Sequence, residues 1–283
     1  MIRHFRQILL LLGLALPCIA LAADPAPRNA GPYVPSPQTV VADMLRIAGV
    51  GPKDFVIDLG SGDGRIVLTA AQVFGASGFG VEIKDDLVKL SNEAAQKAGL
   101  ADRVKFIKAD LFKADFSKAT VLTMYLLPDT VNALRDKLFN DLRPGTRIIS
   151  HDYSLGGWKY KEMRHMDLED KVQISGVTTT LIFLYLVPEK IAGAWQAKLP
   201  PAIGREAASF NFVQDITTIN GTASVGEARV RLSNGLIQGD QLSFVVDLGG
   251  KSHSFEGRVK DGTVTGTVKV RGEVAPWSAT RAK

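Results

Sequence analysis

The chain has little of what several classes of protein depend on. Its 283 residues include one cysteine, Cys18, and only 7% aromatic residues, and its formal net charge is +5. It has no arginine-rich run with interleaved aromatic side chains, a pattern typical of proteins that track a single nucleic-acid strand. We therefore expect a solvated, slightly basic surface and no nucleic-acid partner.

An apolar run long enough to span a membrane is also missing. The N-terminus instead has the order of a secretory signal: Arg3 and Arg6, an apolar stretch over 8–16, and a small-x-small cleavage site at 20–22. This order predicts a signal peptide over residues 1–22 and no stable membrane span after its cleavage. The alternative is an uncleaved membrane anchor or a buried N-terminal helix.

Loss of the signal would also remove Cys18 and leave a mature chain without thiols, which suits an oxidising compartment. We therefore expect a periplasmic or extracellular protein. The whole chain is 46% apolar, which is ample for a core, and its length suggests two domains. Nothing in the sequence indicates an oligomeric state.

Residues 23–37 are rich in proline, alanine and glycine and predict an extended lead-in. Ser36 can cap a helix with Pro37 at its first position, and apolar residues then recur at helical spacing. From 54 to 152, short β-branched runs alternate with helical stretches, which predicts a parallel sheet with helices on both faces, within a domain that covers residues 38–188. The predicted strands are 55–59, 78–83, 104–108, 119–125 and 146–151, and the predicted helices between them are 64–74, 85–98 and 129–142.

The composition changes after Pro188. Residues 189–283 lack a long helical pattern and show short alternating runs broken by turn dipeptides such as Asn220-Gly221 and Asp261-Gly262. Several of these dipeptides are strong hairpin signals. The region predicts a small antiparallel β domain, either a barrel or a sandwich, and we find no catalytic constellation in it.

The most informative run covers residues 56–65, where a buried-strand pattern breaks into a glycine-rich turn and continues as a helix. Glycines at such a turn let the backbone approach a ligand, and the free N–H groups of the new helix face it. Their positions, 60, 62 and 64, differ from the G-x-G-x-x-G spacing of a dinucleotide site. The flanking acids Asp58 and Asp63 would repel a pyrophosphate and attract a cation. A tight turn without a ligand is the alternative.

The segment from Asp58 to Gly64 matches D-x-G-x-G-x-G and resembles the first motif of the class I S-adenosylmethionine-dependent methyltransferases. Their cofactor carries a cationic sulfonium and an ammonium group, which suits the two acids. The resemblance implies a seven-stranded, mostly parallel Rossmann-like sheet, S-adenosylmethionine as cofactor, and no metal. Strands near 164–173 and at 179–187 would supply the final antiparallel hairpin of that sheet.

Ligands of open α/β sheets bind outside the carboxyl ends of the strands. The resemblance implies that Glu82, at the end of the second strand, accepts both ribose hydroxyls. It also implies that Asp110, which Leu111 follows, meets the adenine amino group. The predicted cofactor-binding residues are Tyr33, Asp58, Gly60, Ser61, Gly62, Asp63, Gly64, Glu82, Asp110 and Leu111.

The methyl acceptor is predicted at the ends of the fourth and fifth strands. In-line displacement mainly needs positioning and exclusion of water, so few obligatory residues are expected. Tyr125, Tyr153 and Trp158 could form an aromatic wall that attracts an ammonium group. We also assign catalytic roles to Tyr125, His151 and Asp152, of which His151 or Asp152 could deprotonate the amine. The alternative is that Tyr125 and Trp158 are core residues and that His151 is a satisfied strand-end histidine.

More of the chain narrows the resemblance. Pro32-Tyr33-Val34-Pro35, the glycine motif and the acid at the second strand are together similar to the family of lysine methyltransferases that modify the c-ring protein of ATP synthase, which distantly resemble Dot1-type enzymes. In that family the lead-in folds over the cofactor, which would bring Tyr33 and Val34 into the site. The signal and the β-rich tail depart from the family pattern, and residues 150–153 lack its Arg-Phe-x-x-Pro character.

These observations predict an S-adenosylmethionine-dependent methyltransferase whose acceptor is a protein lysine or a small molecule of the envelope. Export leaves open how a charged cytoplasmic cofactor reaches the enzyme. Two other hypotheses remain: an exported module that binds the cofactor or another nucleoside without catalysis, and a surface protein whose β domain does the main work. The acids at 58, 82 and 110 favour the enzyme.

Overall fold

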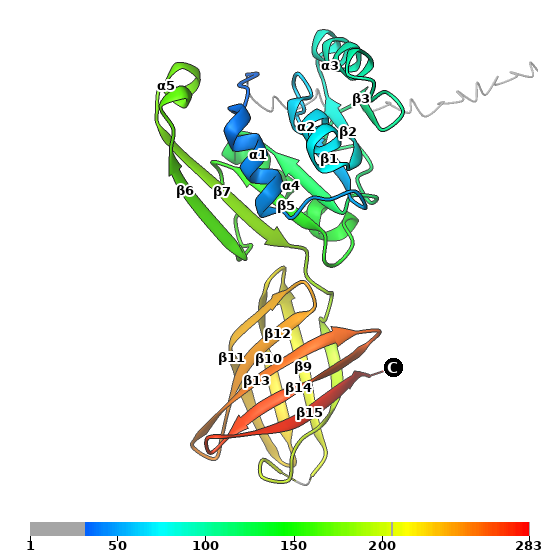
Figure 1. The fold of residues 1–283 in the computed structure, drawn as a ribbon. Coiled ribbons are helices and arrows are strands. Elements are labelled where there is room, and N and C mark those ends of the chain that lie inside the picture. Colours follow the sequence, from blue (N-terminus) through cyan, green and yellow to red (C-terminus); the bar gives the residue numbers. More distant parts are fainter. Residues whose placement is uncertain (1–31, 205, 283) are drawn as a thin grey trace, which may run out of the picture.

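The computed structural model describes residues 32–204 and 206–282. The predicted signal peptide and residues 23–31 of the lead-in lie outside these ranges. The chain forms an α/β domain followed by a closed antiparallel β-barrel, one above the other in Figure 1. Among the described residues, no helix has both the length and the apolar character needed to cross a membrane.

The α/β domain is built on a seven-stranded sheet with the order β3-β2-β1-β4-β5-β7-β6. Strands β1 to β5 are parallel to one another, and β7 is antiparallel to both β5 and β6. The strands are β1 (Phe55–Leu59), β2 (Ser77–Glu82), β3 (Val104–Lys108), β4 (Val121–Met124), β5 (Arg147–His151), β6 (Glu162–Asp167) and β7 (Thr179–Leu186). The helices are α1 (Gln38–Ile47), α2 (Arg65–Phe74), α3 (Asp85–Lys97), α4 (Pro128–Asp141) and α5 (Glu169–Ser175). The Rossmann-like class I architecture is thus confirmed.

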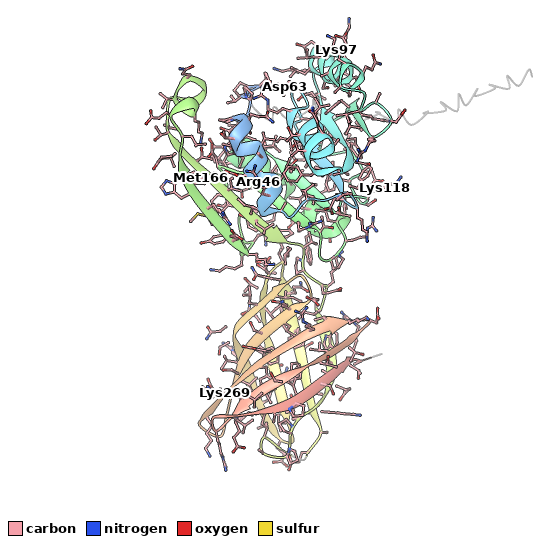
Figure 2. All side chains as sticks on the ribbon, viewed as in Figure 1. Arg46, Asp63, Lys97, Lys118, Met166 and Lys269 are labelled. Atoms are coloured by element: carbon pink, nitrogen blue, oxygen red, sulfur yellow. The ribbon has the colours of Figure 1, made fainter. Side chains whose placement is uncertain are left out.

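Helices cover the two faces of this sheet because neighbouring strand residues point to opposite sides. Val56 of β1 belongs to the core cluster that α1 and α2 complete, whereas Ile57 belongs to the cluster that α4 completes. Met166 of β6 packs against the first of these clusters (Figure 2). The apolar residues on both faces of the sheet are buried under helices. A ligand can therefore reach the sheet only at the ends of the strands.

Two local predictions are wrong. Residues 168–173 do not continue a strand, because the chain forms the short helix α5 between β6 and β7, ending at Gly176 in the left-handed conformation (φ 77°). Ser36 does not cap α1: Pro37 occupies the N-cap position without a side-chain hydrogen bond. The Ser36 hydroxyl instead lies 2.8 Å from Nδ1 of His151, a buried partner 115 residues away.

The second domain is a closed eight-stranded barrel, which decides between the two predicted β architectures. Its strands are β8 (Gly193–Lys198), β9 (Ala208–Asp215), β10 (Thr218–Val225), β11 (Ala228–Gln238), β12 (Gln241–Leu248), β13 (Lys251–Lys260), β14 (Thr263–Val270) and β15 (Glu273–Arg281). Six buried aromatic side chains fill its interior: Trp195, Phe210, Phe212, Phe244, Phe255 and Trp277. The Phe244 and Phe255 rings stack at 4.8 Å, and Trp277 packs edge-on against both.

The barrel joins the α/β domain at the amino edge of the sheet. Strand β7 runs against β5, so its last residue lies beside Arg147, where β5 begins. Across the junction, Thr217 Oγ1 accepts a hydrogen bond from Lys159 N at 2.8 Å, and Arg135 pairs with Asp215. Ile216 is buried within the core cluster of the α/β domain. The barrel is therefore packed against the edge opposite the carboxyl ends of the parallel strands.

Candidate active site

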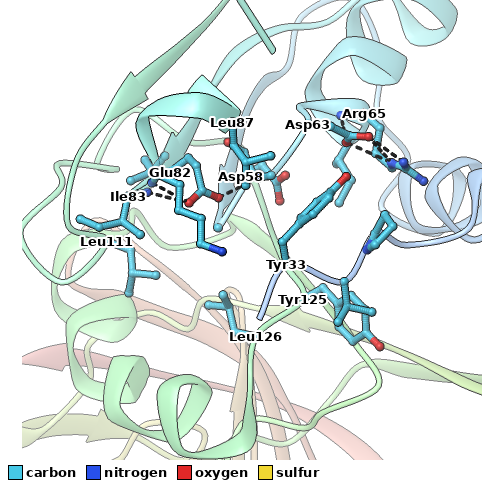
Figure 3. Close-up of a pocket in the computed structure, with 18 of the residues that line it drawn as sticks. Tyr33, Asp58, Asp63, Arg65, Glu82, Ile83, Leu87, Leu111, Tyr125 and Leu126 are labelled. Carbon is cyan, nitrogen blue, oxygen red and sulfur yellow. Dashed lines mark hydrogen bonds and ion pairs between the residues drawn. The ribbon is translucent and has the colours of Figure 1, made fainter. Parts of the chain in front are cut away.

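A cavity of about 240 Å³ lies at the carboxyl ends of β1, β2 and β4, with residues 32–36 along one side (Figure 3). Nine of the ten predicted cofactor-binding residues line it, and Gly64 does not. Gly64 is the left-handed N-cap of α2, with φ 81°. Of the predicted acceptor-side residues, only Tyr125 lines the cavity.

The glycine loop forms the floor of the cavity because side chains would not fit there. Gly62 has φ 53°, and a Cβ atom on it would lie 2.4 Å from the Tyr33 ring. A Cβ atom on Gly60 would lie 2.7 Å from Leu126. The loop is fixed by the N–H groups of Gly60 and Ser61, which both donate to the Val81 carbonyl at 2.9 and 3.0 Å. Glycine at these two positions thus allows Tyr33 and Leu126, which both line the cavity, to pack closely against the loop.

Asp58 is buried beside the loop and accepts a hydrogen bond of 2.6 Å from the Thr123 hydroxyl. Burial raises the pKa of Asp58 to about 7, Thr123 opposes this rise, and the carboxylates of Glu82 and Asp63 add to it. A bound cation would favour the ionised form of Asp58. The site therefore suits a positively charged ligand better than an anionic one.

Glu82 is held at the end of β2 by three backbone N–H groups. Its Oε2 accepts from Gly62 at 3.0 Å, and its Oε1 accepts from Ile83 and Lys84 at 2.8 and 3.0 Å. On the next strand along, Asp110 Oδ1 accepts from Phe112 N at 2.9 Å. Both carboxylates line the cavity, as the sequence predicts. Their contacts to ribose and adenine remain predictions.

The sequence predicts that Asp63 attracts a cationic ligand, but in the structure its carboxylate is paired with Arg65. Arg65 donates to both carboxylate oxygens of Asp63, with the shortest contact at 2.6 Å, and also to the Ser36 carbonyl at 2.8 Å. Burial opposes ionisation of Asp63, but the Arg65 hydrogen bonds bring its pKa below the usual value. In Figure 3 the Tyr33 hydroxyl points toward Asp63. The pair therefore fastens the lead-in beside the cavity, a role that the sequence did not indicate for Arg65.

Tyr125, which the sequence predicts on the acceptor side, lines the cavity with its ring centroid 4.0 Å from that of His151 and 6.4 Å from that of Tyr153. In Figure 3 the Tyr125 hydroxyl points away from the cavity. Burial, followed by interaction with the Asp152 carboxylate, raises the pKa of Tyr125. This tyrosine therefore stays protonated and presents its ring to the cavity.

His151 and Asp152 lie behind Tyr125. Burial lowers the pKa of His151 to about 4, although Asp152 opposes the shift, so the imidazole is neutral at pH 7. Both oxygens of Asp152 accept hydrogen bonds from Lys171 Nζ, at 2.7 and 2.8 Å. Neither residue lines the cavity, so direct deprotonation of an acceptor by either one needs a different arrangement. Lys171 belongs to the segment predicted as a strand, and no sequence signal identified it.

Trp158, predicted to be part of a substrate wall, lies in the core and does not line the cavity. It is 5% exposed and packs edge-on against Tyr185 at 6.2 Å. Tyr185 in turn accepts a hydrogen bond from Leu155 N at 2.9 Å. Trp158 is thus part of the packed loop between β5 and β6. Tyr153 contacts Tyr125 without lining the cavity.

The residues around the cavity fit S-adenosylmethionine. The glycine cradle, formed by Gly60 and Gly62, lets Leu126 and Tyr33 pack closely around the cavity, and the buried Asp58 favours a cation. Within residues 32–204 and 206–282, no group of three or more His, Cys, Asp or Glu side chains could hold a metal ion.

Known proteins match the α/β part of the chain. A family model described as the ANTKMT methyltransferase domain matches residues 58–162. The chain is 41% identical over 159 residues to a protein-lysine N-methyltransferase of Saccharolobus islandicus, covering 56% of this chain and 94% of that protein. It is 34% identical over 128 residues to the adenine nucleotide translocase lysine N-methyltransferase of Mus musculus, covering 45% of this chain and 56% of that protein.

A solved structure is also similar. The RNA methyltransferase from Salinibacter ruber, in complex with S-adenosyl-L-homocysteine, is 47% identical, with a TM-score of 0.50 over 56% of this chain and 96% of that chain. The motif, the sheet, the cavity and these matches agree. The chain therefore belongs to the S-adenosylmethionine-dependent methyltransferase family that includes the Saccharolobus islandicus enzyme, and S-adenosylmethionine is its cofactor.

Proposed function

We propose that this methyltransferase modifies the ε-amino group of a lysine in a protein partner. The observation that carries the proposal is the 41% identity over 94% of an archaeal protein-lysine N-methyltransferase. The mouse relative is named for lysine methylation of the adenine nucleotide translocase, which is also a protein acceptor. The aromatic ring of Tyr125 at the cavity supports an amine acceptor, since ring faces attract ammonium groups.

The side chains of the cavity divide the work between cofactor and acceptor. Bound S-adenosylmethionine supplies a methyl group on a cationic sulfonium. We assign the ribose hydroxyls to Glu82, the adenine edge to Asp110 and Leu111, and the cover over the cofactor to Tyr33. Tyr125 then shields the reacting centre from water and aligns the amine for in-line attack. Because His151 and Asp152 lie behind Tyr125, we expect the acceptor lysine to lose its proton to solvent before transfer.

RNA is the second candidate acceptor because the Salinibacter ruber structure carries that name. The charge of the domain argues against it. Residues 32–188 contain as many acidic as basic residues, so this region has no net formal charge. A protein that neutralises many phosphates is expected to carry an excess of lysine and arginine. Lysine is therefore the better supported acceptor.

The test is a transfer assay with methyl-labelled cofactor and two acceptors, a lysine-rich protein extract and total RNA. We expect label in the protein, recovered as methyl-lysine by mass spectrometry. Label confined to RNA would overturn the lysine proposal. If calorimetry shows no binding of S-adenosylmethionine or S-adenosylhomocysteine, the enzyme assignment itself fails.

We further propose that the protein is exported and that its acceptor lies in the envelope. The basic, apolar and small-residue order of residues 1–22 supports this proposal. N-terminal mass spectrometry of the protein from fractionated cells should find Ala23 as the first residue outside the cytoplasm. An intact chain confined to the cytoplasm would contradict export and also remove the question of cofactor supply.

A further inference from the structure

Lys171 is the one lysine or arginine among the buried residues of the described chain, with 2% exposure. It lies on α5, at the tip of the β6–β7 hairpin, which extends beyond the carboxyl edge of the sheet. Its Nζ donates to both oxygens of Asp152 and to the Thr179 carbonyl. A buried ion pair is rarely more stabilising than apolar residues of the same volume. Stability alone therefore does not account for a buried ion pair whose carboxylate interacts with Tyr125, a residue that lines the cavity.

Asp152 is held in an uncommon conformation by this hairpin. It follows the last residue of β5 with φ 61°, a left-handed value that non-glycine residues seldom adopt. Its backbone N–H donates to the Leu181 carbonyl at 2.7 Å, and its Oδ1 accepts from Leu181 N at 3.1 Å. Lys171 Nζ donates to both oxygens of the same carboxylate. The carboxylate is thus fixed on one side by β7 and on the other by α5.

The fixed carboxylate acts on the acceptor wall. Asp152 interacts with the hydroxyl of Tyr125, and Tyr125 lines the cavity with its ring. His151 stacks against the same ring and is in turn bonded to Ser36. Neither Asp152 nor Lys171 lines the cavity. Lys171 therefore reaches the reacting atoms only through Asp152 and Tyr125.

We propose that Lys171 is a positioning residue for methyl transfer, which fixes Asp152 so that it orients Tyr125 while adding no net charge to the acceptor side. The proposal rests on the proposed lysine acceptor. A lone carboxylate near the cavity would favour the ammonium form of that lysine, which cannot attack a methyl group. Paired with Lys171, Asp152 can hold Tyr125 without this effect. His151, whose Nε2 lies 3.5 Å from Asp152 Oδ1, is neutral at pH 7 and adds no charge to this pair.

The kinetic test compares Lys171→Met, Lys171→Arg and the double variant Asp152→Asn with Lys171→Met. In Lys171→Met we expect kcat to fall at least tenfold, affinity for S-adenosylhomocysteine to change less than twofold, and the rising limb of the pH profile to move to higher pH. The double variant should return that limb to its wild-type position, and Lys171→Arg should retain most of the activity. Lys97→Met is the matched control, because this exposed lysine also lies on a helix (Figure 2).

Two results would overturn the proposal. One is an unchanged kcat and pH profile in Lys171→Met. The other is a loss of cofactor affinity in parallel with kcat, which would show that Lys171 only supports the fold. Retention of the displaced pH limb in the double variant would count against the charge argument as well.

A spectroscopic test needs no acceptor and separates this proposal from the proposed function. In lysine ¹⁵N NMR of the full chain, the Lys171 ammonium should exchange slowly with water and give a distinct signal that Asp152→Asn abolishes. Absence of that signal overturns the ion pair even if lysines are methylated. If the signal is present but only RNA is methylated, the lysine acceptor is wrong, and the kinetic comparison is decided with RNA as substrate.

Discussion

The barrel closes its interior with six large aromatic side chains, whereas the α/β domain leaves the carboxyl edge of its sheet open around a cavity. Glycines make room for side chains of the protein in both regions, but with different results. A Cβ atom on Gly257 in the barrel would lie 3.2 Å from Trp277, whose ring fills the interior. Gly60 and Gly62 let Leu126 and Tyr33 pack closely where these side chains line the cavity. The comparison places cofactor chemistry in the first domain and leaves only the outer surface of the second for contacts.

The largest expected effect comes from removing one of the large aromatic side chains that fill the barrel interior. Trp277→Ala removes a ring that packs against Phe210, Phe244 and Phe255. We expect a loss of about 3–5 kcal/mol in the free energy of unfolding of the barrel, measured by denaturant titration. Affinity for S-adenosylhomocysteine should stay unchanged below the transition. A parallel loss of affinity would show that the two interiors are coupled across the junction.

A side chain added to the glycine loop beside the cavity should have the next largest effect. In Gly62→Ala the new methyl group must displace the Tyr33 ring, and the residue must keep a left-handed backbone. We expect cofactor affinity to fall by about 2–3 kcal/mol, measured by calorimetry. The control is Gly249→Ala, because Gly249 has a similar φ of 56° but no atom within 4 Å of a new Cβ. Equal affinities in the two variants would contradict the cradle.

Removal of one carboxylate tests the ribose assignment. Glu82→Ala should weaken cofactor binding by about 1–3 kcal/mol through the loss of charge-assisted hydrogen bonds. Glu82→Gln, which keeps an oxygen that can accept from Gly62 N, should bind with an affinity between those of the wild type and Glu82→Ala. Glu93→Ala, at an exposed acid of α3, serves as the control for charge alone. If Glu82→Ala binds as tightly as the control, Glu82 does not hold the ribose.

The smallest expected effect is a pH dependence of binding. Asp58 has a pKa of about 7 in the free protein, and a cationic ligand binds its carboxylate form. Binding therefore releases a proton below pH 7, and affinity for S-adenosylmethionine should be about tenfold lower at pH 6 than at pH 8. Asp58→Asn should remove this contribution. If the affinity of Asp58→Asn changed with pH as much as that of the wild type, the titrating group would belong to the ligand.

Most helices and strands of the seven-stranded sheet domain could be predicted from local sequence patterns. The predicted strands and helices from 55 to 151 agree with the observed ones within two residues at each end. This is because β-branched runs and glycine turns depend on residues that are neighbours in the sequence. The predictions failed where a distant residue competes. Ser36 bonds to His151 instead of capping α1, and Lys171 reaches Asp152 from a helix of seven residues.

In the candidate site, too, some features follow from the order of residues along the chain and others depend on tertiary packing. Residues of the glycine motif and the strand-end acids are set by chain order, so they could be predicted to meet at one edge. Whether an aromatic residue faces a cavity or the core depends on tertiary packing, which pattern alone does not contain. Tyr125 and Trp158 had the same sequence evidence, yet only Tyr125 lines the cavity.

The attachment of the barrel at the amino edge places the cavity at the end of the sheet that faces away from the barrel. The cavity lies at the opposite edge of the same sheet, and a barrel strand of eight residues spans roughly 26 Å. A partner bound at the far end of the barrel would therefore be separated from the cavity by the length of the barrel and by the length of the strands of the sheet.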